Sequence, residues 1–126
     1  MKDFGDVIGL IPIEYVASVS PIGVVPKQGY SIDTFFTENS VTPTDTPEEK
    51  DAGVAYNQSL KVATDRLSAE LRKRYARNRK CIAYLYHSDG EFTVWGTLDI
   101  PVSVSVSPYI NADQIYITRK ALSPIL

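Results

Sequence analysis

The residues with the strongest chemistry in this sequence form a run of cations, AELRKRYARNRKC, over residues 69–81. Residues 66–80 hold seven Lys and Arg side chains and a single acid, Glu70. A run of this kind suits contact with phosphates or with an acidic partner, and it equally suits the solvated face of a helix. If most of these cations touched phosphate, binding to nucleic acid would depend strongly on salt. Both interpretations stay open at the level of the sequence.

Two side chains suited to nucleophilic or acid–base chemistry, Cys81 and His87, each occur once in the chain. Nucleophilic catalysis requires a base beside the nucleophile. Six residues along one strand separate this pair by about 20 Å, so the two side chains do not meet within one chain. We expect a buried structural thiol at Cys81 and a surface or turn histidine at His87. An enzyme centred on this pair is one hypothesis to test.

Acidic side chains gather in two places, a turn that holds Asp89 and Glu91 and the segment 39–53. In the turn, Asp has a local conformational role. The acids of the segment do not follow a calcium-loop spacing, and one Cys with one His gives too few ligands for a zinc site. The seven Gly form no phosphate-binding loop. We therefore expect no catalytic residue, no metal, no cofactor and no small-molecule substrate.

The elements that would position these residues follow from the spacing of apolar side chains. Period-two alternation is typical of strands, and it recurs along most of the chain. The Asp89–Gly90 pair predicts a tight turn between two of the strands. The seven expected strands are residues 7–19, 30–38, 54–62, 81–87, 92–98, 101–108 and 114–120.

A single helix is predicted at about residues 65–77. Leu67, Leu71 and Tyr75 recur every four residues and form a narrow apolar stripe. Thr64 or Asp65 is expected to cap the helix at its start, and Asn78 is the expected cap at its end.

The fold class follows from the order of these elements. Because strands and helices do not alternate, a doubly wound α/β fold is unfavourable. We predict an α+β domain of mostly antiparallel strands, a sandwich or a partly closed barrel, with the helix packed on one side. Residues 1–126 are expected to form a single domain. The segment 39–53 is expected to be a long, mobile, acidic loop.

Charge is unevenly distributed along the chain. Residues 1–58 hold three Lys and nine acids, 3 − 9 = −6, and residues 59–126 hold ten Lys or Arg and six acids, 10 − 6 = +4. This asymmetry suits head-to-tail contact between copies, which closes into rings or builds tubes. The residues expected to bind partners are Arg72, Lys73, Arg77, Arg79, Glu48 and Glu49.

The start of the chain differs from a secretory signal. Asp3 and Asp6 stand where positive charges are required, and Pro12 and Glu14 interrupt the apolar run. No stretch reaches the ~18 apolar residues of a membrane span. We therefore expect a protein made in the cytoplasm without membrane contact.

The run VAYNQSLKVATDRLSAELRKRYARNRKCIAYLYHSDGEFTVWGTLDIPVSVSV, at about 54–107, resembles a pattern in small bacteriophage and prophage virion proteins of the neck and tail. The pattern is a strand, a short helix with a basic end, an apolar strand, a hairpin of the form DGxxxxxG from Asp89 to Gly96, and a strand that starts at Pro101. Tail-tube-like proteins of this kind have a β-barrel or sandwich flanked by one helix and assemble as rings.

The resemblance covers under half of the chain and implies no catalytic residue. It implies a structural subunit, a connector, ring, tube or adaptor component, that is made in the host cytoplasm and located in the virion. Its partners would be other copies of itself and other virion proteins.

The alternative is a small nucleic-acid-binding module that contacts DNA through the basic helix 66–80 and Tyr75. A sequence pI of about 5.3 opposes it, since free-standing nucleic-acid binders usually have a net basic domain.

Overall fold

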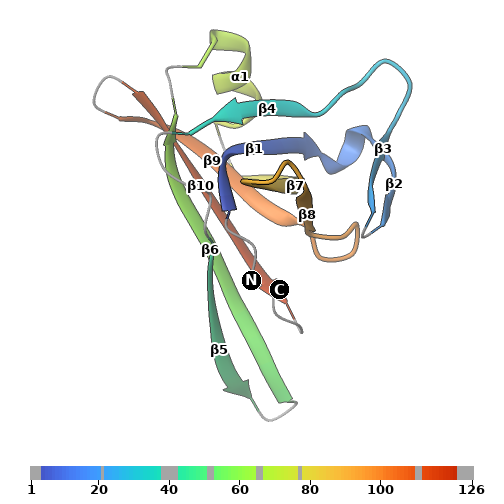
Figure 1. Ribbon diagram of the computed structural model, residues 1–126, viewed down its shortest axis with the longest axis vertical. Coiled ribbons are helices and arrows are strands. Elements are labelled where there is room, and N and C mark those ends of the chain that lie inside the picture. Colours follow the sequence, from blue (N-terminus) through green and yellow to red (C-terminus); the bar gives the residue numbers. More distant parts are fainter. Residues whose placement is uncertain are drawn as a thin grey trace.

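The computed structural model of the chain describes residues 4–20, 22–37, 43–50, 53–64, 67–76, 78–109 and 112–121. Within them lie ten strands, one 3-10 turn and one α-helix (Figure 1). Their bounds are β1 Phe4–Pro12, η1 Ile13–Tyr15, β2 Val16–Ser20, β3 Gly23–Pro26, β4 Asp33–Phe36, β5 Thr44–Lys50, β6 Gly53–Thr64, α1 Ala69–Arg74, β7 Arg79–His87, β8 Phe92–Trp95, β9 Val102–Tyr109 and β10 Ala112–Ala121. The predicted class, mostly antiparallel strands with one helix, is confirmed.

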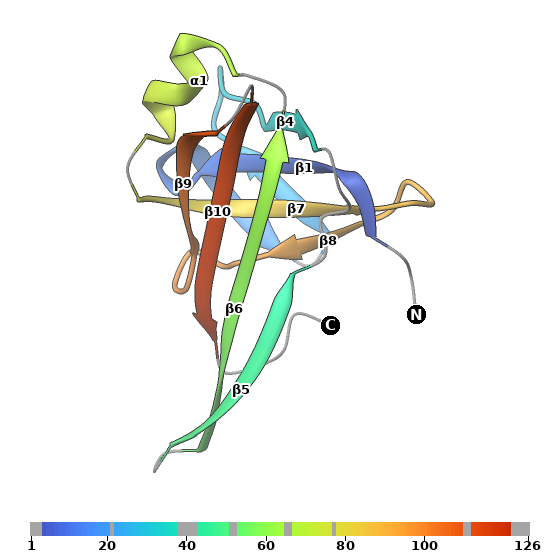
Figure 2. The ribbon, with the colours of Figure 1, turned by 90° about the vertical axis from the view of Figure 1, so that its left-hand side faces the viewer.

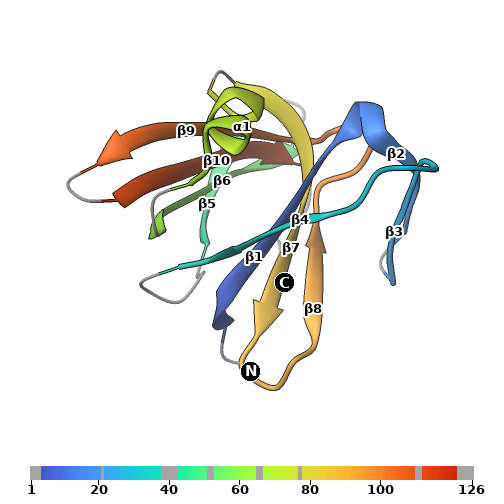
Figure 3. The ribbon, with the colours of Figure 1, turned by 90° about the horizontal axis from the view of Figure 1, so that it is seen from above.

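Eight of the strands form one antiparallel sheet, in which β7 is the branch point. The order is β4-β1-β7-β9-β10-β6-β5, and β8 pairs with β7 off this path. Residues Arg79–Cys81 of β7 pair with β9, and Ala83–Tyr86 pair with β8. Figures 2 and 3 show the result: the half made of β5, β6, β9 and β10 crosses steeply over the half made of β1, β4, β7 and β8.

The two halves approach each other again on the side opposite β7, but they do not join into a ladder. An isolated bridge connects Thr37, just after β4, to Thr64 at the end of β6. Over the described residues the pairing goes no further there, so the sheet is sandwich-like and is not closed into a barrel.

The main hydrophobic core lies between the two halves of the sheet. Its fully buried members come from both halves, and alternate positions of β9 and β10 contribute to it regularly. Strand β7 is buried on both faces. Cys81, Ala83 and Leu85 belong to the main core, and Ile82 belongs to an outer cluster beneath the β2–β3 hairpin. This double burial explains why β7 reads as a continuous apolar run.

Helix α1 spans one end of the sandwich, and it is shorter than predicted (Figure 1). The expected apolar stripe is confirmed, with Tyr75 fully buried and Leu67 and Leu71 packed against the core. The expected caps are wrong. Ser68 is the N-cap, its hydroxyl accepting the Leu71 N–H at 3.3 Å, and Tyr75 is the C-cap.

The helix starts late because the preceding chain is held elsewhere. Strand β6 runs on to Thr64, whose hydroxyl bonds to the backbone carbonyl of Asp113 on β10 at 3.3 Å. The helix stops early because Tyr75 turns into the core, and its carbonyl accepts the Val106 N–H of β9 at 2.8 Å.

Three strand predictions need correction. The expected loop 39–53 includes a strand, because Thr44–Lys50 forms β5 and pairs with β6 from Thr44–Ser59 to Lys50–Gly53. The expected strand 7–19 breaks after Pro12, which has no N–H to donate, into the 3-10 turn and β2. Strand β3 lies between the expected strands 7–19 and 30–38, where no strand was predicted.

Removing the hydroxyl of Tyr75 tests how this end of the sandwich is held. Its Oη donates to Asp33 Oδ2 at 2.6 Å, so Tyr75→Phe leaves a partly buried carboxylate short of one donor. We expect a loss of about 1–3 kcal/mol in the free energy of unfolding, measured by urea denaturation. The matched control is Tyr116→Phe on an exposed ring, which should stay within about 0.5 kcal/mol of the wild type. Equal effects of the two variants would contradict this role of Tyr75.

Candidate interaction surface

The first arginine of the basic stretch is fixed to a carboxylate of its own chain. Asp113 of β10 has a relative exposure of only 1%. Its Oδ2 accepts the Leu67 backbone N–H at 2.7 Å and the Arg72 Nε–H at 3.0 Å. A buried carboxylate needs such donors, because desolvation without them is costly. Arg72 therefore helps to position the start of the helix and neutralises the charge beneath it.

The second arginine, Arg74, forms a fork with Asp33 of β4. Its Nη1 donates to both carboxylate oxygens, at 2.9 and 2.7 Å, and its Nη2 donates to Glu70 Oε1 at 2.9 Å. Glu70 and Arg74 thus form an i,i+4 ion pair on the helix. The hydrogen bond to Asp33 raises the pKa of Arg74. Burial, and then the bond to Asp33, raise the pKa of Tyr75, so its hydroxyl stays protonated and donates.

The third arginine, Arg79 at the start of β7, reaches back to the 3-10 turn. Its Nη2 and Nε donate to Glu14 Oε1 at 2.7 and 3.1 Å, and its Nη1 donates to the Arg74 carbonyl at 3.0 Å. The guanidinium carbon lies 5.4 Å from the centre of the Tyr15 ring, which stacks on Tyr30. Arg79 therefore ties the helix exit to the β1–β2 corner.

The contacts of these arginines show which residues of the basic stretch are already paired within the chain. Arg72 and Arg79 are engaged by their own chain, whereas Lys73 is exposed. Arg77 lies outside the described residues. Glu48 and Glu49 fall in β5, and their side chains lie outside the described part of the structure. Because the arginine forks face inward, the stretch acts mainly as a structural clamp.

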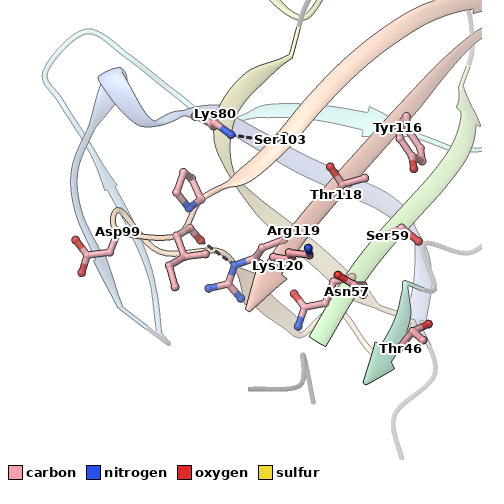
Figure 4. Close-up of a pocket in the computed structure, with 13 residues that line it drawn as sticks. Thr46, Asn57, Ser59, Lys80, Asp99, Ser103, Tyr116, Thr118, Arg119 and Lys120 are labelled. Atoms are coloured by element: carbon pink, nitrogen blue, oxygen red, sulfur yellow. Dashed lines mark hydrogen bonds between the residues drawn. The ribbon is translucent and has the colours of Figure 1, made fainter. Parts of the chain in front are cut away.

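A second cationic surface, which the sequence analysis did not identify, lies on the outer face of the β6–β10–β9 half. It is a groove of about 780 Å³ between this face and the loop that joins β8 to β9 (Figure 4). Polar and hydroxyl side chains form most of its wall, because the alternate positions of these strands point away from the core. The lining residues are Thr46, Asn57, Gln58, Ser59, Lys80, Asp99, Ile100, Pro101, Ser103, Tyr116, Thr118, Arg119 and Lys120.

The described residues of the groove lining have a net positive charge. Lys80, Arg119 and Lys120 face one acid, Asp99, which gives 3 − 1 = +2. Lys80 Nζ donates to Ser103 Oγ at 2.8 Å, and Arg119 Nε donates to the Ile100 carbonyl at 2.8 Å. Burial lowers the pKa of Arg119. In the described part of the chain none of the three cations has a carboxylate partner, which favours an anionic ligand.

The sequence did contain a partial signal for this groove. The period-two run at Ser103, Ser105 and Ser107 marks a polar outer face, and Thr118 of β10 lies opposite Ser103 in the register. What the sequence could not indicate is that Lys80, from another part of the chain, reaches the same face.

Cys81 and His87 lie at the two ends of β7, and neither is presented to solvent. Cys81 is fully buried, and burial raises the pKa of its thiol to about 12, so the expected structural thiol is confirmed. The turn position expected for His87 is confirmed, because its carbonyl accepts the Gly90 N–H at 3.0 Å. Its side chain is not on the surface, since it is only 7% exposed, with Nε2 2.7 Å from Thr93 Oγ1. The turn beyond it is as predicted, with Gly90 at positive φ and the Glu91 N–H bonded to Asp89.

The described residues contain neither a metal-binding cluster nor a membrane-spanning helix. No group of three or more His, Cys, Asp and Glu side chains lies there in an arrangement that could hold a metal ion. No helix among them has the length and apolarity that crossing a membrane requires. Comparison of the chain with known protein families, with curated proteins and with solved structures gave no match.

The different roles of Arg72 and Lys73 can be tested by comparing the free energies of unfolding of two alanine variants. Arg72→Ala removes a donor from the buried Asp113 carboxylate, and we expect a loss of about 1–3 kcal/mol in the free energy of unfolding. Lys73→Ala, one residue further on an exposed position, should change it by less than about 0.5 kcal/mol. Urea denaturation of both variants measures the difference. If Arg72→Ala changed the free energy of unfolding as little as Lys73→Ala, the structural role of Arg72 would be contradicted.

The raised pKa of Cys81 predicts an inert thiol. An unfolded thiol ionises near pH 9, and the folded one near pH 12, so the contribution of Cys81 to stability is present below pH 9 and is lost as pH rises toward 12. At pH 8 the native protein should react with an aromatic disulfide reagent about 100-fold or more slowly than the urea-unfolded protein. The chain has a single Cys, so the released chromophore reports it alone. Equal rates in the two states would contradict the prediction.

Proposed function

We propose that this chain is a non-enzymatic structural subunit of a bacteriophage or prophage virion. It would be a ring, tube or adaptor component of the neck or tail, made in the host cytoplasm and incorporated into the virion. It would act by assembling with copies of itself and with other virion proteins. Besides the resemblance of residues 54–107, the observation that supports this most is an arm that projects from the sandwich (Figures 1 and 2).

The arm is the hairpin of β5 and β6, and the register defines where it leaves the body. The last residue of β6 that pairs with β10 is Tyr56, opposite Ala121. The β5–β6 ladder continues past it through three further pairs, as far as Lys50–Gly53. Three residues of a strand extend the ribbon by about 10 Å. A two-stranded ribbon has marginal stability in water by itself, so such an arm suits contact with another protein.

The outer edge of the arm favours contact through side chains. Strand β5 is an edge strand, and an unprotected edge invites uncontrolled pairing with other chains. Pro47, opposite Tyr56 in the ladder, has no N–H to offer at this edge. Glu48 and Glu49 add charge beside it. Pro47 therefore restricts edge-to-edge pairing, and the sequence charges of Glu48 and Glu49 suit contact with a cationic partner.

The nucleic-acid-binding alternative has less physical support. Three arginines of the basic helix are held by Asp113, Asp33 and Glu14, and phosphate would have to compete with these pairs. Tyr75 is fully buried and offers no ring on which a base could stack. Gel-shift titration with single- and double-stranded DNA and RNA at low salt tests this alternative. Binding tighter than about 100 μM would support it, since non-specific binding normally reaches that range.

Size-exclusion chromatography with light scattering tests the proposed function. We expect a discrete multiple of the 14.0 kDa chain, or a polymer, at low salt. Because surface charge attraction is screened by ions, the assembled fraction should fall as salt rises from about 0.05 to 0.5 M. Electron microscopy of the assembled fraction should show rings or tubes. A chain that stays monomeric at high concentration and joins no virion particle would overturn the proposal.

A further inference from the structure

Among the described residues, the groove on the outer face of β6, β9 and β10 is lined by three cations and one acid. Lys80 and Lys120 are exposed, and Arg119 is partly withdrawn from water. A partly desolvated guanidinium is stabilised by a carboxylate that comes into contact with it. Asp99 sits on the rim and reduces the positive charge of the lining without cancelling it.

The arm has the complementary charge. Residues 43–53 hold one Lys and four acids, Asp45, Glu48, Glu49 and Asp51, which gives 1 − 4 = −3. Strand β5 places Glu48 and Glu49 beyond the last residue of β6 that pairs with β10. The backbone of both residues lies in the part of the β5–β6 ribbon that continues past the β6–β10 ladder (Figure 1).

The arm of a chain is not placed to fill the groove of that same chain. Thr46 and Asn57, near the root of the arm, line the groove, and the ribbon then runs onward. Figures 1 and 2 both show its far end well beyond the loop that joins β8 to β9. The two surfaces are different and complementary, so they can be satisfied together only between copies.

We propose that the acidic β5–β6 arm of one copy docks in the Lys80–Arg119–Lys120 groove of the next. This inference rests on the proposed function and names the surfaces through which the copies would meet. The contact is heterologous, so every copy uses one arm and one groove, and repetition gives a ring or a tube. Hydroxyls such as those of Ser103 and Thr118 supply further hydrogen bonds to the docked carboxylates and backbone.

Reciprocal charge reversal tests this contact. The arm variant is Glu48→Lys with Glu49→Lys, and the groove variant is Lys80→Glu with Lys120→Glu. In each variant the arm and the groove then have charge of the same sign. We expect the concentration for half-assembly, measured by light scattering, to rise about tenfold or more for either variant alone. Mixing the two variants should restore assembly, because the basic arm of one then meets the acidic groove of the other.

The matched control is Lys27→Glu with Lys61→Glu, which makes the same charge change at exposed positions that do not line the groove. It should assemble nearly as the wild type does. Circular dichroism and the urea midpoint confirm that each variant is folded.

Three results would overturn the inference. The first is that the groove variant and the arm variant each assemble as well as the control. In that case the proposed function stands, and the contact between copies lies elsewhere. Another is a mixture that assembles no better than its parts. The third is a wild-type chain that self-assembles at no concentration, and binding to virion particles would then decide the proposed function separately.

Discussion

The whole arrangement depends on the way Tyr75 closes one end of the sandwich. Its ring is buried beside Phe35, its hydroxyl bonds to Asp33 on β4, and its carbonyl bonds to Val106 on β9. Strands β4 and β9 belong to different halves of the sheet. A single residue therefore connects both halves to the helix at the end where the ladders do not join. Without it, the helix would be held by the packing of Leu67 and Leu71 and by the salt bridges of Arg72 and Arg74.

Those salt bridges explain why the basic stretch is not simply a cationic face. Arg74 and Arg79 each donate through more than one guanidinium N–H, and Arg72 donates through Nε, as suits a planar group with several donors facing carboxylates. Lysine has a strongly hydrated point charge and is left on the surface, as at Lys73 and Lys80. These three arginines and these two lysines thus have different roles. Arginines hold elements together, and lysines remain available for contacts with other molecules.

The sequence indicates local structure well wherever one face is buried and the other is wet. The serine–valine alternation of β9 and the Asp89–Gly90 turn have the conformation that their pattern predicts. Leu67, Leu71 and Tyr75 pack in the core as predicted, although only Leu71 lies within α1. Local sequence propensity does not predict strand β5. Pro43 directly precedes this strand, and Pro47 lies within it. An edge position tolerates a missing donor, and pairing with a long neighbour stabilises residues that would be a loop by themselves. Tertiary context, absent from a local window, decides that case.

The candidate surfaces were harder to predict than the fold because their members are distant in sequence. Asp113 is 41 residues from Arg72, and Glu14 is 65 residues from Arg79, so no local pattern reveals that these charges are paired. The groove could not be predicted for the same reason, because it combines residues of β7 and β10 with the loop before β9. A surplus of cations in a sequence identifies a charged segment, but only the pairing shows which charges remain for a partner.

The arm and the groove share a framework, and this constrains any assembly built from them. Strand β6 forms one side of the arm and also supplies Asn57 and Ser59 to the groove, whose floor continues into β10. Because one continuous ladder connects the two surfaces, the direction of the arm relative to the groove is set by the twist of the sheet. In a heterologous contact that relation fixes the rotation from one copy to the next. The rotation in turn decides whether the copies close into a ring or continue as a helix.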